Sequence, residues 1–164
     1  MRILGIDPGL AIIGYGVIDV DNGNFRVVDY GVITTPKDET IPVRLAMIWD
    51  RVNLLISKFK PDHIAMEELF FTNNKTTGII VSEARGVLLL AAVQSPAKLY
   101  EYTPMQIKQA ITGYGKADKQ QMQNMVRILL KLDTIPKPDD AADALAVAIC
   151  HGQTSRFNEM FRMR

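Results

Sequence analysis

Four acidic side chains stand in apolar surroundings, where a carboxylate is costly unless something pairs with it. Asp7 ends the apolar stretch RILGID, and Glu67 follows the apolar residues of HIAM. Asp140 and Asp143 stand three residues apart in DDAADALAVA, among alanine and aliphatic residues. A buried carboxylate costs free energy unless it is hydrogen-bonded, paired or bound to a metal. These four positions are therefore the candidates for chemistry.

Simpler interpretations exist for most of the acids in these stretches. Asp-Pro-Gly is turn chemistry, Asp139 suits the position just before a helix, and Asp140 would favour the helix dipole. Asp143 is harder to explain, because capping does not extend to the second turn of a helix. Alternation along a strand points only one of Glu67 and Glu68 toward a given face.

Electrostatics favours a metal site over these separate interpretations if the acids come together. Two carboxylates about 5 Å apart repel by roughly 3 kcal/mol at an effective dielectric of about 20. A group of four would therefore need cations or protons. All-oxygen ligands suit Mg²⁺, with Mn²⁺ as a substitute. Two such ions, about 3.5–4 Å apart, can clamp the attacking and leaving oxygens of a phosphodiester. We therefore expect two Mg²⁺ per active site.

The apolar periodicity divides the chain into the elements that would hold these acids. The expected strands are 2–7, 11–20, 25–35, 63–69 and 99–103, and the expected helices are 41–59, 77–94, 104–111, 118–132 and 138–152. An initial meander followed by alternating helices and strands predicts an α/β fold. Its sheet should be mixed and five-stranded, with helices on both faces.

This arrangement would gather the acids at one edge of the sheet. Crossover connections make strands 2–7 and 63–69 parallel neighbours, and open α/β sheets bind ligands at the carboxyl ends of such strands. Asp140 and Asp143 would share one face of the last helix. The alanines beside them allow that helix to come close to the sheet. Gly14 and Gly16 would either weaken their strand or let another backbone approach.

Length and composition indicate one domain spanning residues 1–164, of which 151–164 form a basic tail. The chain has 164 residues, 48% hydrophobic and 23% charged, which is typical of soluble globular proteins. Its apolar runs, such as VLLLAAV, are too short to span a membrane. Asp7 within the first apolar stretch argues against a signal peptide. The single Cys150 is expected to be a buried thiol. We therefore expect a cytoplasmic protein with no membrane partner.

Charge is distributed unevenly, although the formal net charge is only +1. Residues 104–137 contain six basic and two acidic side chains. This indicates a local basic patch, although a solvated helix face explains the same cluster. The stretch GVLLLAAV is apolar on every side, and one sheet can cover only one side of a helix. We therefore expect a two-fold homodimer whose interface includes this helix.

Four motifs together resemble one known family. GIDPG, AMEELF, SEARG and DAADALA are similar, in order and spacing, to motifs of the RuvC family of Holliday junction resolvases. The resemblance runs from Arg2 to about His151. It implies a ribonuclease H-like fold, a homodimer and Mg²⁺-dependent cutting of two symmetric strands of a four-way DNA junction. The nicks would carry 5′-phosphate and 3′-hydroxyl ends, and a branch-migration helicase complex would be a partner.

The resemblance also implies roles for individual residues. The metal-binding acids of the family correspond to Asp7, Glu67, Asp140 and Asp143. The aromatic residue after the fourth strand corresponds to Phe70, which would stack on a base. The DNA-binding lysines correspond to Lys108 and Lys119, and Lys116 is an additional basic residue of the same loop.

Two other functions remain open from the sequence. One is a nuclease of the same fold that acts on RNA, including ribosomal precursors. The other is a non-catalytic nucleic-acid-binding domain, against which the intact set of acids argues. A ribonuclease H proper takes a glutamate from its first helix, whereas the only acid in the interior of helix 41–59 is Asp50.

Overall fold

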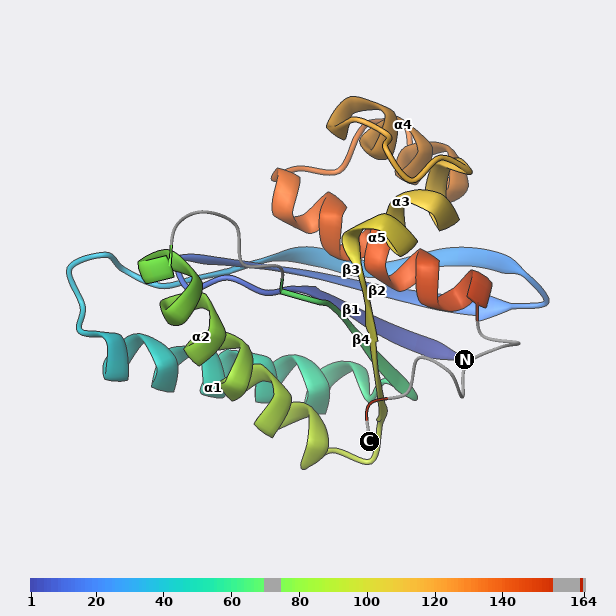
Figure 1. Cartoon of the computed structure of the whole chain (residues 1–164). Helices are drawn as coiled ribbons and strands as arrows, with labels where there is room; N and C mark the ends of the chain where they lie inside the picture. The colour runs from blue at the N-terminus through green and yellow to red at the C-terminus, as the bar shows by residue number, and fades with distance from the viewer. Residues whose placement is uncertain (70–74, 155–162, 164) are drawn as a thin grey trace.

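Helices and strands follow one another in the order that the periodicity predicts (Figure 1). This computed structural model describes residues 1–69, 75–154 and 163. The strands are β1 (Arg2–Asp7), β2 (Ile12–Asp21), β3 (Asn24–Thr34), β4 (His63–Glu67) and β5 (Lys98–Tyr102). The helices are α1 (Ile41–Phe59), α2 (Lys75–Val93), α3 (Pro104–Thr112), α4 (Lys119–Leu129) and α5 (Asp139–Thr154).

The five strands form one mixed sheet in the order β3-β2-β1-β4-β5. β2 pairs antiparallel with both β1 and β3, while β4 pairs in parallel with both β1 and β5. The hairpin between β2 and β3 turns at Asn22 and Gly23, both of which have positive φ angles. Asn-Gly tolerates this conformation. The parallel pairing of β1 with β4 confirms the pairing expected for the first and fourth strands.

Helices cover both faces of the sheet, as Figure 1 shows. α1 and α2 pack on one face, over a core that includes Leu4, Ile6 and Ile64. α3, α4 and α5 lie on the other face, over a core that includes Ile3 and Ala65. Alternate residues of β1 therefore serve opposite cores, as strand geometry requires. Among the described helices, none is long and apolar enough to cross a membrane.

α5 lies unusually close to the sheet because glycines face it. A Cβ atom at Gly5 would collide with the carbonyl oxygen of Ala144, and one at Gly14 with that of Asp140. A Cβ at Gly16 would come within 2.8 Å of the Leu145 side chain. Of the two interpretations of the glycines in β2, the close approach of another backbone is thus confirmed.

Element boundaries differ from the expected ones at a few places. α2 begins at Lys75, before the expected start at residue 77, because a polar first turn carries no apolar periodicity. α4 ends at Leu129, and Lys131 has a φ of +54°, which interrupts the expected helix. Asp139 is the first residue of α5 instead of the residue before it. Cys150 is fully buried, as expected.

Candidate active site

The four acids meet at the carboxyl ends of β1 and β4. The parallel register pairs Ile6 with Met66, so Asp7 and Glu67 come next on neighbouring strands. Across the other edge of β1, Asp7 pairs with Gly14 of β2. The carbonyl of Asp140 lies directly over Gly14, because only a glycine leaves room for it there. The start of α5 therefore sits over the end of β1.

The charges of these carboxylates interact. Burial raises the pKa of Asp7 to about 8, with further contributions from Glu67, Asp143 and Asp140. Burial and Asp143 also raise the pKa of Glu67 above its usual value. The neighbouring carboxylates therefore disfavour ionisation of Asp7, and Asp143 disfavours ionisation of Glu67, as expected for like charges in a partly buried site. The structure thus brings together all four acids that the sequence singles out.

Lysine side chains approach this group from two helices. Lys119, at the start of α4, places its Nζ 3.6 Å from Oδ2 of Asp143 and 3.2 Å from Oδ2 of Asp139. The pKa of Asp143 is nevertheless raised, because burial outweighs the opposing effect of Lys119. Lys108 of α3 lies close enough to Glu67 to oppose the rise of its pKa.

Two other candidate residues are placed differently. Lys116 is exposed and lines a mostly apolar cavity of about 700 Å³ between α3 and the end of α5. In the part of the chain that the structure describes, no ion pair joins Lys116 to a carboxylate. Phe70 lies outside the described residues.

The donor chemistry of the site fits a hard divalent cation. Carboxylate oxygens are the ligands that Mg²⁺ prefers, and a cation among Asp7, Glu67 and Asp143 would favour the ionised forms, whereas burial and neighbouring acids raise the pKa values of these carboxylates. Yet no group of three or more His, Cys, Asp and Glu side chains within residues 1–69, 75–154 and 163 is arranged as a metal site. Beside Asp143, the positive charge in this structure comes from Lys119.

Sequence reasoning missed the surroundings of Lys119. Asp139 was expected to cap α5, but its carboxylate binds Lys119 and also accepts a hydrogen bond of 2.8 Å from Lys137. These lysines lower the pKa of Asp139. The only signal in the sequence was the sign change in KPDD, which many solvated helix starts share.

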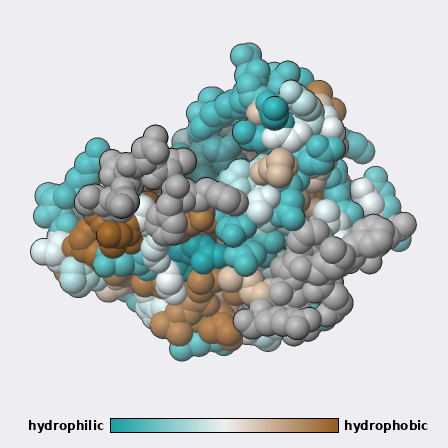
Figure 2. All heavy atoms as spheres, viewed as in Figure 1, coloured by the Kyte–Doolittle hydropathy of each residue, from teal (hydrophilic) through white to brown (hydrophobic). Residues whose placement is uncertain are grey.

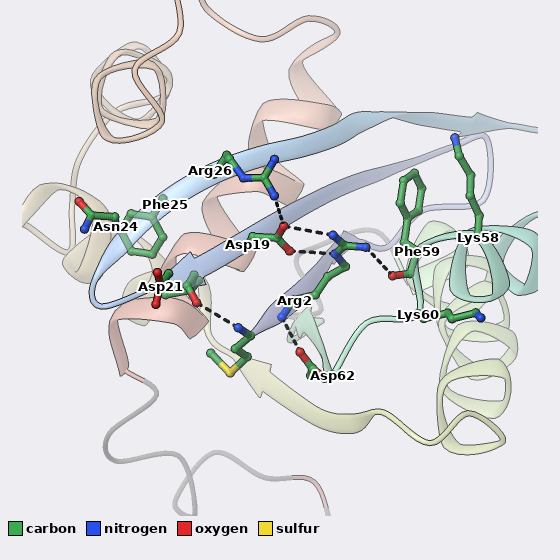
Figure 3. Close-up of a pocket in the computed structure, with 12 residues that line it drawn as sticks. Arg2, Asp19, Asp21, Asn24, Phe25, Arg26, Lys58, Phe59, Lys60 and Asp62 are labelled. Atoms are coloured by element: carbon green, nitrogen blue, oxygen red, sulfur yellow. Dashed lines mark hydrogen bonds and ion pairs between the residues drawn. The ribbon is translucent and has the colours of Figure 1, made fainter.

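Another cavity, of about 880 Å³ and lined by charged residues, lies at the opposite end of the sheet from the acids (Figure 3). Its charged groups largely satisfy one another. Arg2 binds both oxygens of Asp19, at 2.8 and 3.1 Å, and donates to the carbonyl of Phe59. Arg26 binds the same carboxylate at 2.6 Å. This network ties β1 to β2, β3 and the end of α1, so we assign it to stability.

Comparisons with known proteins agree with this geometry. A family model described as crossover junction endodeoxyribonuclease RuvC matches residues 3–151. The crossover junction endodeoxyribonuclease RuvC of Alkaliphilus oremlandii is 52% identical over 164 residues, which cover 100% of both chains. That of Desulfitobacterium hafniense is 55% identical over 154 residues, which cover 94% of this chain and 93% of the relative.

A solved structure gives the same result. The structure of T. thermophilus RuvC in complex with Holliday junction substrate superposes with a TM-score of 0.90 at 33% identity. The match covers 99% of this chain and 100% of that one. The expected ribonuclease H-like fold is thereby confirmed. By sequence and by structure, the chain belongs to the RuvC family of crossover junction endodeoxyribonucleases.

Proposed function

We propose that this protein is a Holliday junction resolvase of DNA recombination and repair. It cuts two symmetric strands of a four-way junction by hydrolysis and leaves 5′-phosphate and 3′-hydroxyl ends. The observation that carries this proposal is the convergence of four carboxylates at one edge of the sheet. Family membership supports it, and the T. thermophilus relative has been solved with a Holliday junction substrate.

Asp7, Glu67, Asp140 and Asp143 are the residues that would hold Mg²⁺. When bound, Mg²⁺ supplies Lewis-acid activation of water and of the phosphodiester, and Mn²⁺ should substitute because it takes similar oxygen ligands. Strand ends hold Asp7 and Glu67 rigidly, and the packing of α5 on glycines fixes the other two. The partial burial of the carboxylates limits the water that competes for them.

Basic residues next to the acids would hold the DNA. Lys108 and Lys119 interact with Glu67 and Asp143, so their ammonium groups lie where a phosphate must arrive. Lys116, on the exposed segment between α3 and α4, would contribute a more peripheral phosphate contact. Contacts of this kind make binding fall steeply with salt concentration.

Phe70 would stack on an unpaired base at the crossover. The support is its position three residues after Glu67 and the family motif AMEELF. Stacking of this kind contributes roughly 1–3 kcal/mol per base. Phe70→Ala should therefore fold and bind junctions but cut them far more slowly, which single-turnover cleavage measures. If the variant instead cleaves normally per folded molecule but loses much of its melting temperature, Phe70 is a core residue and does not stack on DNA.

A two-fold homodimer would place two such sites on one junction. In support, α2 exposes Ile79, Leu90 and Val93, which are 60%, 50% and 68% exposed. Leu90 lies about three helical turns after Ile79, and Val93 lies about four turns after it, so the three side chains share one face of the helix. Figure 2 shows hydrophobic residues gathered along the lower part of this side of the molecule, where Figure 1 places α2. A branch-migration helicase complex and a cytoplasmic location are further expectations from the family and the sequence.

A substrate competition tests the proposed function. The full chain is incubated with Mg²⁺ and equal amounts of a four-way DNA junction, a linear DNA duplex and an RNA–DNA hybrid. The proposal predicts that the junction is cut and that the other two substrates remain largely intact. Preferential cutting of the hybrid, or binding without cutting of any substrate, would contradict it.

A further inference from the structure

Lys119 lies between two carboxylates that have different expected roles. Its Nζ is 3.2 Å from Oδ2 of Asp139 and 3.6 Å from Oδ2 of Asp143. Asp143 is an expected metal ligand, whereas the family motif assigns no metal-binding role to Asp139. One lysine is therefore shared between a residue of the proposed metal site and a residue outside it.

The local structure fixes this geometry from both sides. Asp118 caps α4, where its side chain accepts a hydrogen bond of 2.8 Å from the amide of Gln121, so Lys119 begins a well-defined helix. Asp139 and Asp143 stand four residues apart on α5, which places them on one helix face. The Lys119 side chain is 57% exposed and keeps the freedom to shift from one carboxylate to the other.

An ammonium group and a divalent cation compete for the same carboxylate oxygens. Lys119 next to Asp143 lowers the gain from placing a cation there, because part of the negative charge is already neutralised. Asp139 provides an alternative partner at a slightly shorter distance. The balance between the two ion pairs should therefore influence how well a cation binds to Asp143.

We propose that Asp139 is a positioning residue, which holds Lys119 when a divalent cation occupies Asp143. This inference rests on the proposed metal site. With Asp139 present, Lys119 moves only from one carboxylate to its neighbour and stays at the edge of the site. Without Asp139, Lys119 has Asp143 as its nearest carboxylate and competes with the cation.

The test measures Mn²⁺ binding to the full chain without DNA, from the electron paramagnetic resonance signal of the free ion. The variants are Asp139→Asn, Lys119→Met and the double variant, and circular dichroism checks that each one folds. Asp139→Asn should weaken Mn²⁺ binding by about two- to fivefold, which is the range expected for an exposed ion pair. Lys119→Met should tighten it, because the competing charge is gone.

The double variant separates this inference from a direct effect of charge. If Asp139 acts through Lys119, Asp139→Asn has little effect on Mn²⁺ binding in the Lys119→Met background. Lys137→Met is the matched control, because Lys137 also binds Asp139 but makes no described contact with Asp143. It should leave Mn²⁺ binding unchanged.

Each contrary result has a distinct meaning. Equal weakening by Asp139→Asn with and without Lys119 would show a direct charge effect and overturn the positioning role alone. No weakening by Asp139→Asn would do the same. Failure of the wild-type protein to bind Mn²⁺ at millimolar concentration would overturn the proposed metal site together with this inference.

Discussion

Among the four acids of the site, Asp7 has the most strongly raised pKa. Its pKa of about 8, against a usual value of 3.8, means that burial and neighbouring acids disfavour its charged form. Between these two values the folded state binds more protons than the unfolded state, so the free energy of unfolding decreases as the pH rises. A bound divalent cation would remove this penalty, because it favours the ionised form.

Asp7→Asn should therefore change how stability depends on pH. In the presence of EDTA, its melting temperature relative to wild type should increase from pH 5 to pH 8, because the amide cannot ionise. Added Mg²⁺ at pH 8 should raise the melting temperature of wild type and have little effect on the variant. Thermal unfolding followed by circular dichroism measures both effects. If the difference in melting temperature between Asp7→Asn and wild type stays constant across this pH range, the pKa of Asp7 is not raised as proposed.

Cleavage should depend on the same acids. Asp7→Asn and Asp143→Asn should each abolish cutting of a junction, while binding in Mg²⁺-free buffer stays nearly intact, because each change keeps the shape but weakens a metal ligand. Gel-shift and cleavage assays on one junction measure the two properties. Near wild-type cutting by either variant would mean that the site assignment is wrong.

The packing of α5 on the sheet determines where two of the four acids lie. Gly14→Ala would drive a Cβ atom into the carbonyl of Asp140, so the helix start must move. We expect a loss of roughly 1–3 kcal/mol in the free energy of unfolding, together with slower cleavage by the molecules that remain folded. Urea unfolding and single-turnover cleavage measure these two quantities.

Gly31→Ala is the matched control for this change. Its Cβ would meet the Tyr15 side chain at 3.0 Å, where the ring can shift, instead of a backbone atom. It lies in β3 of the same sheet and should cost less stability and leave cleavage per folded molecule unchanged. Equal losses from the two variants would contradict the role assigned to the contact between Gly14 and Asp140.

A buried polar chain fastens the end of α5 to β4 and β5. Nε2 of His151 lies 2.8 Å from Nδ1 of His63, and its Nδ1 lies 2.7 Å from the hydroxyl of Tyr102. Burial, reinforced by His63, lowers the pKa of His151 to about 3, against a usual 6.5. The unfolded state therefore binds more protons between these values, and stability is lost as the pH falls through this range.

His151→Gln should remove part of this pH dependence. The variant should be less stable than wild type at pH 7, because it loses buried hydrogen bonds. The difference in melting temperature should shrink from pH 7 to pH 5, because only wild type carries a histidine that must stay neutral at this position. Thermal unfolding at the two pH values checks this expectation. A gap that widens at pH 5 would contradict a neutral His151.

Features that depend on local sequence patterns could be predicted, whereas contacts between residues far apart in the sequence could not. Apolar periodicity predicts each strand and helix that the structure describes, and the placement of Asp7 and Glu67 follows from two parallel strand ends. The pairing of Lys119 with Asp139 could not be predicted, because it depends on how α4 packs beside α5. The histidine–tyrosine chain was also missed, since His63 and His151 are far apart in sequence and belong to no motif.

The exposed apolar face of α2 bears on the assembly of the whole molecule. Leu90→Glu should convert the proposed dimer into a monomer, because a charge would be buried in the interface. Ile128→Glu is the control, since Ile128 is similarly exposed, at 55%, but lies on α4. Sedimentation velocity at micromolar concentration distinguishes the two states. A wild-type protein that sediments at the monomer mass of 18.3 kDa would contradict the dimer.

A strand-resolved map of the cleavage products tests the central claim most directly. Each of the four strands of a junction is labelled in turn, and the junction is incubated with Mg²⁺ and either wild type or Asp7→Asn. We predict cuts at symmetric positions in two strands, nicks that a DNA ligase reseals, and no cuts by the variant. Cuts in a single strand, ends that cannot be resealed, or equal cutting by Asp7→Asn would contradict resolution of junctions by this carboxylate site.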